Sequence, residues 1–296
     1  MRAHFARTAA VLVPLALFAA GCGSERAGTG DRSGDSGARS AGAGDRARDV
    51  AAAWDGSKAA EVWRAGYYPL SDVVQLPEHA FRDEDDKMAY ASENYVLAAE
   101  LPTGAPEKGK VEWESGSSLS LPLMDARKAY DGVARGGNDG PHLTVTAVKL
   151  GKATLVTSRG PATVPAWLFT LDGYDTPLKR VALEPSVLPG SPIEPLENAT
   201  DELLELQQLV EVGRDGRTVT VLAGHGACDD GADVKVLETA GSVVLSGSIV
   251  GASDGDCTAQ LLFQKVTVKL KRELGERVLL DAFTGAPVAR RDLPLT

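Results

Sequence analysis

A serine between two glycines is the first residue in this sequence whose setting suggests chemistry. Gly251-Ala-Ser-Asp-Gly255 matches the G-x-S-x-G pattern of a nucleophile elbow and follows a run with strand character. The α/β-hydrolases that use this elbow place their histidine after the serine, whereas no histidine follows His225. The sequence downstream also alternates like strands. We therefore interpret the motif as a loop, treat His225 as structural or exposed, and assign no catalytic residue.

Acidic side chains gather beside two cysteines. The aspartates are Asp229, Asp230 and Asp233 after Cys228, and Asp254 and Asp256 before Cys257. Hard carboxylate oxygens in this number could hold calcium. The alternative is a pair of solvated turns whose mutual repulsion is screened by water and salt. We favour solvated turns, because these acids lie in glycine-containing segments with no evident framework of backbone carbonyls, and we assign neither a metal nor a cofactor.

The three cysteines predict one disulfide. Cys22 lies at the end of an N-terminal leader, which leaves Cys228 and Cys257 in the body of the chain. Their spacing fits neither a C-x-x-C redox motif nor a zinc site. Two thiols in an oxidising, extracytoplasmic setting pair readily. We expect a bond between Cys228 and Cys257.

The leader itself has the composition of a secretory signal peptide. Arg2, His4 and Arg7 form a basic head, an apolar run covers Ala9 to Ala20, and small residues lead into Cys22. The apolar run is shorter than the ~20 residues that span a bilayer as a helix. Residues 1–21 are therefore predicted to be a cleaved signal peptide.

The Ala-Ala-Gly-Cys end of the leader resembles the lipobox of bacterial lipoproteins. In that family the cysteine thiol receives a diacylglycerol and becomes the first residue after cleavage. With Gly160–Phe169 and Leu274–Asp281, this end makes the chain similar to secreted actinobacterial lipoproteins of unknown function. The resemblance implies lipidation of Cys22 and a place on the extracytoplasmic face of the cell membrane. An ordinary secretory signal with a coincidental cysteine is the alternative.

The charge balance excludes some partners. Removal of the leader, with Arg2 and Arg7, would leave 29 basic against 41 acidic side chains, a formal net charge of −12. Nucleic acids are bound through neutralised phosphates, so this acidity argues against them as partners. It also argues against electrostatic docking on anionic lipid, so attachment to the membrane would depend on the lipid anchor at Cys22.

Composition and local signals divide the chain into segments. Gly23 to Asp49 has alanine as its only apolar side-chain type and balances five arginines against five acids. Such a segment has little to bury, which predicts a disordered tether. We expect residues 22–49 to be the lipidated cysteine and tether, residues 50–190 an α+β domain, and residues 191–296 a β-rich domain. The prolines between Pro185 and Pro195 would mark the connection.

The first predicted domain contains short helices followed by strands. Ser57 is the expected N-cap of a helix that Gly66 ends, and Asp125 that of a second helix. Asp83 to Asp86 is expected to be a loop or helix start. The aromatic residues Trp54, Trp63, Tyr67 and Tyr68 are assigned to core packing, with an exposed sugar-binding row as the alternative.

Period-two alternation predicts strands from His142 onward. In the first domain they cover Leu143–Ala147, Lys152–Ser158 and Thr163–Leu171, with a turn at Gly151 and an edge or bulge at Pro165. Two hairpins then follow, around Arg214-Asp215-Gly216 and around Ala240-Gly241. A perfectly alternating strand at Lys265–Lys271 and a last one near Val278 complete the pattern. The fold class is mainly β, with a small sandwich or partial barrel as the second domain.

The function expected from these signals is binding. No catalytic constellation survives, which favours a non-enzymatic envelope module with an unidentified ligand or protein partner. An anchored hydrolase is the alternative, since two carboxylates suffice for glycoside cleavage and acids are plentiful. A cleft that brings paired carboxylates together would favour this hydrolase.

Overall fold

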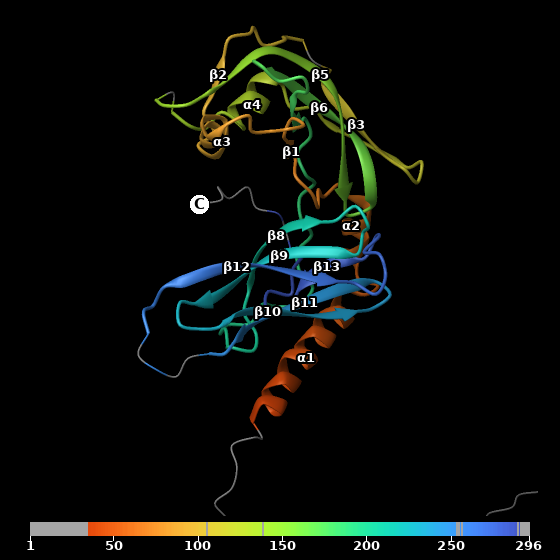
Figure 1. The fold of residues 1–296 in the computed structure, drawn as a ribbon. Coiled ribbons are helices and arrows are strands. Elements are labelled where there is room, and N and C mark those ends of the chain that lie inside the picture. The colour runs from red at the N-terminus through yellow and green to blue at the C-terminus, as the bar shows by residue number, and fades with distance from the viewer. Residues whose placement is uncertain are drawn as a thin grey trace, which may run out of the picture.

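The chain folds into two lobes stacked one above the other (Figure 1). The structure is a computed structural model that describes residues 35–104, 106–137, 139–252, 255, 257–288 and 290, with side chains placed from residue 42 onward. The upper lobe is built on a seven-stranded sheet, and the lower lobe contains two three-stranded sheets. The predicted mainly β fold, with helices in the N-terminal part, is confirmed.

One curved sheet encloses two short helices in the upper lobe (Figure 1). Its strands are β1 (Val74–Gln75), β2 (Tyr95–Leu97), β3 (Lys108–Trp113), β4 (Ser118–Pro122), β5 (Leu143–Thr157), β6 (Gly160–Leu171) and β7 (Leu178–Val181). The helices are α3 (Glu84–Ala91) and α4 (Ala126–Asp131). The long β5–β6 hairpin organises the sheet, because β6 pairs with β5 along one edge and with both β3 and β7 along the other.

The upper sheet has a core on each face. Ala162, Val164 and Ala166 of β6 belong to one hydrophobic cluster, whereas Trp167 and Phe169 belong to another. No register shift interrupts the β5–β6 pairing between these residues. Because side chains alternate across a strand, the two clusters lie on opposite faces of the sheet. Helices α3 and α4 cover the face that carries Trp167 and Phe169.

The turn predicted at Gly151 is absent, and this prediction was wrong. Gly151 pairs with Ala166 inside β5, which runs unbroken for 15 residues. A Cβ atom at this position would approach Leu168 Cδ1 to 2.5 Å. The glycine therefore makes room for a neighbouring side chain, which is a known use of glycine in a strand interior.

Pro165 lies inside β6 and not at a sheet edge. It pairs with Lys152 of β5 without a bulge. On its other side the neighbour of β6 changes from β3, which pairs at Ala162 and Thr163, to β7, which pairs from Ala166. The missing N–H of proline is tolerated at this change of partner, while the Pro165 carbonyl accepts a hydrogen bond from Ala182 N at 2.9 Å.

The lower lobe has three layers. One sheet contains β8 (Leu206–Val212), β9 (Thr218–Gly226) and β12 (Leu261–Lys269), and the other contains β10 (Gly231–Glu238), β11 (Ser242–Val250) and β13 (Val278–Asp281). The two sheets pack face to face, which confirms the predicted small β-sandwich. Helices α1 (Asp35–Trp54) and α2 (Lys58–Ala65) cover the outer face of the second sheet.

The structure corrects the prediction of a disordered tether from Gly23 to Asp49 for the second half of that segment. Residues from Asp35 are helical, and Ala43, Ala47 and Val50 are buried against the β11–β13 sheet. Arg46 also donates to the carbonyls of Ala282, at 3.0 Å, and Glu194. Alanines spaced along one helical face bury enough surface when a sheet lies opposite them, which composition alone did not reveal. Residues 23–34 lie outside the described part of the chain.

The expected domain boundary near residue 190 lies between the strands of the upper sheet and those of the lower sheets. It does not divide the hydrophobic cores, because helices from before this boundary pack in the lower lobe. Residues 184–199 form an irregular connection, as the prolines predicted. Yet Trp54, Ala60 and Trp63, expected in the first domain, pack with Val244 and Leu280 of the lower lobe. All four aromatic residues of this stretch are buried, which confirms their assignment to core packing.

The predicted helix caps are confirmed. The Ser57 hydroxyl accepts from Ala60 N, and Asp125 caps α4 in the same way. Asp83, expected only as part of a loop or helix start, is the N-cap of α3. Among the described residues, no helix is both long and apolar enough to cross a membrane.

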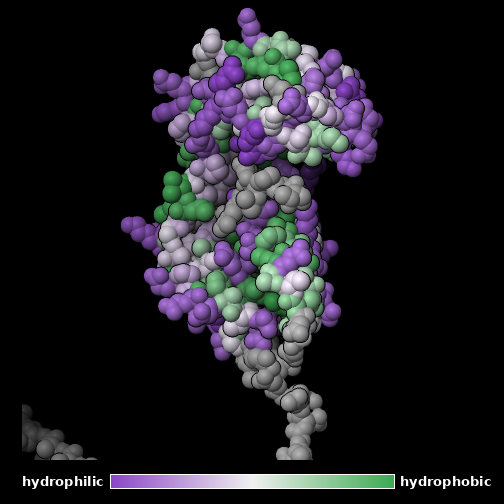
Figure 2. All heavy atoms as spheres, turned by 90° about the vertical axis from the view of Figure 1, so that its left-hand side faces the viewer, coloured by the Kyte–Doolittle hydropathy of each residue, from purple (hydrophilic) through white to green (hydrophobic). Residues whose placement is uncertain are grey.

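The surface of the lower lobe has an exposed apolar patch at the start of β12, formed by Leu261, Leu262 and Phe263. Figure 2 shows hydrophobic residues gathered on this side of the lower lobe.

Candidate functional site

The segment from Tyr67 to Leu70 joins the two lobes. Ser158 N donates to Tyr68 O at 2.9 Å, and Leu70 N donates to Val156 O at 2.8 Å, so the segment pairs with the end of β5. Val212 N of β8 donates to Leu70 O at 2.8 Å. One extended stretch is thus hydrogen-bonded to the upper sheet and to the lower sandwich.

The proline-rich connection is pinned to the same segment. Ser186 N donates to Tyr67 O, and Tyr67 N donates to Ser186 Oγ, both at 2.9 Å. The Tyr68 hydroxyl donates to Val187 O at 3.0 Å. These bonds hold the connection against the first crossing between the lobes.

A cavity of about 580 Å³ lies where these segments meet. Its wall combines α2, the Tyr67–Leu70 segment, α4, β7, the connection and the end of the described chain. Most of the lining is apolar, with Leu70, Val73, Leu183, Leu188 and Val288 among its members. This volume falls within the ~300–1,000 Å³ typical of small-molecule sites.

An aromatic pair forms one wall of the cavity. The rings of Trp63 and Tyr68 stack with centroids 4.4 Å apart and planes 6° from parallel. Both residues are buried, and Trp63 Nε1 has no hydrogen-bond partner among the described residues. The two stacked rings support each other and back this side of the cavity with apolar atoms.

Charged side chains form another part of the lining. Lys128 on α4 pairs with Glu184 of the connection. Arg290 pairs with Asp72 and also donates to Val210 O. Arg180 on β7 lies beside the C-terminal end of α4, since a Cβ at Gly132 would be 3.8 Å from its Nε atom. Among the described residues, the charged side chains of the lining are Lys128, Arg180, Arg290 and Glu184, with Asp72 paired to Arg290 just outside it.

Tyr67 lies buried behind this charged region. Burial raises the pKa of its hydroxyl, and the charge of Arg180 opposes that rise. Its Oη atom has no hydrogen-bond partner among the described residues. The phenol stays protonated at neutral pH and offers a donor.

Two other cavities contain carboxylates and therefore bear on the alternative of an anchored hydrolase. Glu100 and Asp125 line a cavity of about 650 Å³ beside α4, but Asp125 Oδ1 accepts from Lys128 N at 2.7 Å as a helix cap. A cavity of about 280 Å³ contains Glu112, whose carboxylate pairs with Lys110 and Lys152. Neither arrangement offers two carboxylates free of structural partners.

Asp281 in the lower lobe has a carboxyl group whose pKa is strongly shifted. Burial raises its pKa to about 6, and hydrogen bonds from Phe283 N and from Thr284 oppose that rise. Its carboxylate also accepts from the Thr284 hydroxyl at 3.0 Å. It lines none of the three cavities described above and holds the turn after β13.

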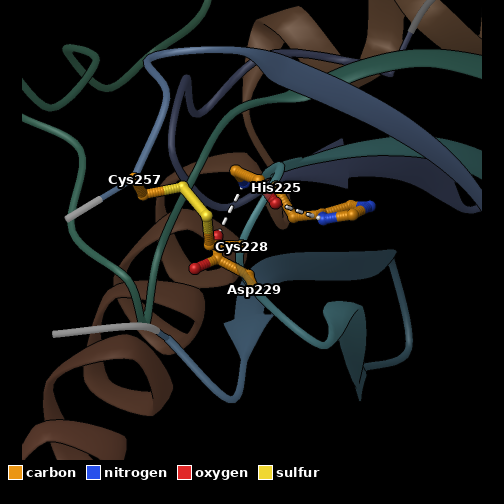
Figure 3. Close-up of a disulfide and its surroundings, with 5 residues drawn as sticks. His225, Cys228, Asp229 and Cys257 are labelled. Atoms are coloured by element: carbon orange, nitrogen blue, oxygen red, sulfur yellow. Dashed lines mark hydrogen bonds between the residues drawn. A yellow bond between two sulfur atoms is a disulfide. The ribbon is translucent and has the colours of Figure 1, made fainter. Parts of the chain in front are cut away.

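The predicted disulfide is confirmed. Cys228 and Cys257 are bonded, with Cα atoms 6.0 Å apart, and join the loop after β9 to the loop before β12 (Figure 3). The His225 imidazole points away from the disulfide, and its Nδ1 lies 2.9 Å from Gly226 O.

The aspartates near the disulfide are only partly described. Asp229 Oδ2 accepts a hydrogen bond from Gly226 N at 2.6 Å and so stabilises the turn to which both residues belong. Ser253, Asp254 and Asp256 lie outside the described residues, as does Cys22. Within the described part of the chain, no group of three or more His, Cys, Asp or Glu residues could hold a metal ion. The calcium alternative therefore stays a prediction.

The cavity between the lobes was not predicted from the sequence. Lys128, Arg180 and Arg290 are far apart in the chain and belong to no motif. The one local signal was the aromatic stretch, which supplies Trp63 and Tyr68, but it was assigned to core packing, with an exposed sugar-binding row as the alternative. Neither a family model, nor a curated protein, nor a solved structure matches this chain.

Proposed function

We propose that this protein is a lipid-anchored, extracytoplasmic binding module that takes a small, largely apolar ligand into the cavity between its lobes. The observation that carries the proposal is the 580 Å³ cavity with its stacked Trp63–Tyr68 wall. A concave, mostly apolar surface with a few convergent polar groups is the usual form of a binding site. The anchor on Cys22 and the extracytoplasmic location rest on the leader alone.

A binding role fits the chemistry around the cavity better than hydrolysis does. Glycoside cleavage needs two carboxylates across a cleft. In the part of the chain that the structure describes, the carboxylate that lines this cavity is Glu184, and Lys128 pairs with it. The anchored hydrolase is the second hypothesis, although Asp125, which lines a cavity with Glu100, is already used as the cap of α4.

A glycine on the cavity rim allows a direct test. Gly132 has a φ of −74°, which any residue adopts, and its added Cβ would meet nothing closer than 3.4 Å. Gly132→Phe should therefore fill part of the cavity without straining the backbone. We expect this variant to bind the fluorescent probe N-phenyl-1-naphthylamine at least tenfold more weakly than the wild type, measured by titration.

Gly137→Phe is the matched control. Gly137 is also exposed and has open space around it, but it lies outside the cavity lining. Its substitution should leave probe affinity unchanged. Equal affinity of the wild type and Gly132→Phe, with both proteins folded, would contradict the cavity as the binding site.

The anchor has its own test. Cys22→Ala removes the only thiol that the leader offers for lipidation. In an actinobacterial host, the wild type should incorporate labelled fatty acid and fractionate with membranes, whereas the variant should do neither. Release of the unlabelled wild type into the medium would contradict the anchor while leaving the cavity proposal intact.

A further inference from the structure

We propose that the exposed apolar patch at the start of β12 contacts the lipid bilayer and fixes the orientation of the anchored protein on its membrane. This inference concerns a surface other than the cavity between the lobes, and it rests on the lipid anchor proposed at Cys22.

The patch projects from the lower lobe. Leu261, Leu262 and Phe263 are between 37% and 54% exposed. Neighbouring side chains of a strand point to opposite faces, so three exposed residues in a row show that both faces of β12 are open where the strand begins. Val250, at the end of β11, is a further exposed apolar residue. Apolar surface gathered in this way is typical of a contact site for a protein or a membrane.

Val250 and the patch lie at the same end of the sandwich. Leu261 pairs with Gly226, the last residue of β9, and Val250 pairs with Gly231, the first residue of β10. Residues 227–230 join these two strands, and the disulfide cross-links this short connection to the loop before β12. The apolar side chains of β11 and β12 therefore share one end of the lower lobe.

Helix α1 begins at this same end. The chain leaves α1 at the opposite end, because a Cβ at Gly241, in the turn between β10 and β11, would be 2.6 Å from Asp55 Oδ1. Earlier in the helix, Arg46 donates to Ala282 O at 3.0 Å, beside the middle of β11. With 20 residues in α1 and nine in β11, both elements are about 30 Å long. The helix follows β11 along its length, and Figure 1 shows its first turn on the side of the lower lobe away from the upper lobe.

The proposed anchor would hold this end of the protein near the bilayer. Residues 23–34 separate Cys22 from the first residue of α1, and a chain of this length spans at most about 45 Å. A surface tethered this close to a second surface meets it at high effective concentration, so a small patch is sufficient for contact. The position of the anchor relative to the patch therefore favours lipid as the occupant.

The contact would depend on apolar burial and not on charge. Asp230 N donates to Val250 O at 2.9 Å, and the Asp230 side chain is exposed, so a carboxylate lies at the same end as the patch. A carboxylate is repelled by anionic head groups, whereas interfacial binding also grows with the apolar area that enters the membrane. We therefore expect contact with zwitterionic lipid that persists in about 1 M salt.

A fluorescent label next to the patch tests the inference. Gln260→Cys would add one reactive thiol, because Cys22 would carry the lipid and Cys228 is bonded to Cys257. The lipidated protein, labelled there with the fluorophore NBD, would be inserted into phosphatidylcholine vesicles that contain nitroxide-labelled lipid. We expect the nitroxide to quench this label and the emission of the label to shift to the blue. Ser120→Cys, exposed on the upper lobe, is the matched control and should show neither effect.

Other outcomes would overturn the inference in distinguishable ways. If the Gln260 label is quenched no more than the Ser120 label, on protein that stays with the vesicles, the contact is refuted while the anchor stands. A blue shift without quenching would show that a protein partner or a second copy covers the patch. Protein that carries no fatty acid and does not stay with the vesicles would refute both the anchor and the contact.

Variants of the patch give a second measurement. In the Gln260→Cys protein, Leu261→Ser combined with Phe263→Ser should reduce quenching about fivefold, because it removes apolar surface that would enter the membrane. Both side chains are half exposed, so the melting temperature should change little. Val187→Ser is the control, since Val187 is 90% exposed but lies in the proline-rich connection. Equal quenching in the double variant and in the control, or quenching that disappears in high salt, would overturn the assignment.

Discussion

The two lobes use their central strands in opposite ways. In the lower lobe, both faces of β11 are buried, with Val243 and Leu245 facing the sandwich core and Val244 facing α1. In the upper lobe, β6 buries one face along its first half and the other face along its second half. The lower sheet therefore needs a cover along its whole outer face, whereas the upper sheet needs two separate partial covers.

This difference explains why the N-terminal helix belongs to the lower lobe. The runs Val243-Val-Leu and Val278-Leu-Leu are continuously apolar, which is typical of strands buried on both faces. The chain supplies the missing layer from residues that precede the upper lobe. Covering the lower sheet in this way also brings Trp63 and Tyr68 to the junction, where they form the cavity wall.

The largest expected effect tests whether α1 is a layer of the lower lobe or a tether. Trp54 is fully buried, and its Nε1 donates to Gly285 O at 2.7 Å. Trp54→Ala should lower the free energy of unfolding by about 4 kcal/mol, since it opens a large cavity. Urea denaturation would measure this loss. Ala52→Gln, on the exposed side of α1, is the control and should change stability by less than ~0.5 kcal/mol.

The disulfide should stabilise the lower lobe alone. Cys228→Ser combined with Cys257→Ser removes the cross-link, which closes a loop of 29 residues. The entropic account gives a loss of roughly 3.5 kcal/mol. Hydrogen exchange should show faster opening in β9 to β12 than in β5 and β6. A uniform increase in exchange across both lobes would show that they unfold as one unit.

Acid should strengthen the lower lobe through Asp281. Its folded pKa of about 6 lies above the unfolded value near 4, so the folded state holds the proton more tightly in this window. Stability is therefore lost as pH rises from about 4 to 6 and is level above that. Relative to Asp281→Asn, the wild type should lose on the order of 3 kcal/mol between pH 4 and 7. A constant difference between the two proteins across this range would refute the shifted pKa.

Acid should weaken the upper lobe through Asp86. Hydrogen bonds from Arg82, at 2.7 and 3.1 Å, lower the pKa of this carboxyl to about 2. Its contribution is present above about pH 4 and is lost as pH falls through 2. Because the Arg82 side chain is half exposed, solvent screening limits the effect to about 1 kcal/mol. Asp86→Asn should cost this amount at pH 7, by urea denaturation, and progressively less as the pH falls through 2.

Local signals in the sequence predicted the elements that depend on nearby residues. Ser57 and Asp125 cap helices because a hydroxyl or carboxylate oxygen reaches an N–H three residues away. The Arg214-Asp215-Gly216 turn forms for the same local reason, with Asp215 accepting from Arg217 N and Thr218 N. The cysteine count predicted the disulfide, because Cys228 and Cys257 are the two thiols that remain in the body of the chain after Cys22, and the fold brings them together.

Tertiary structure decided everything that depends on a distant neighbour. Gly151 was predicted to be a turn because the sequence does not show that the Leu168 side chain occupies the space beside it. The helix from Asp35 is stabilised by the packing of its alanines against a sheet that comes from a distant part of the chain. The cavity is the extreme case, because its lining comes from six parts of the chain. By itself, the sequence determined the caps, the hairpins, the disulfide and a mainly β fold, through interactions between near neighbours or a count of thiols. The layer that covers the lower sheet and the site between the lobes arise only when remote segments pack, since no single segment can bury its apolar surface alone.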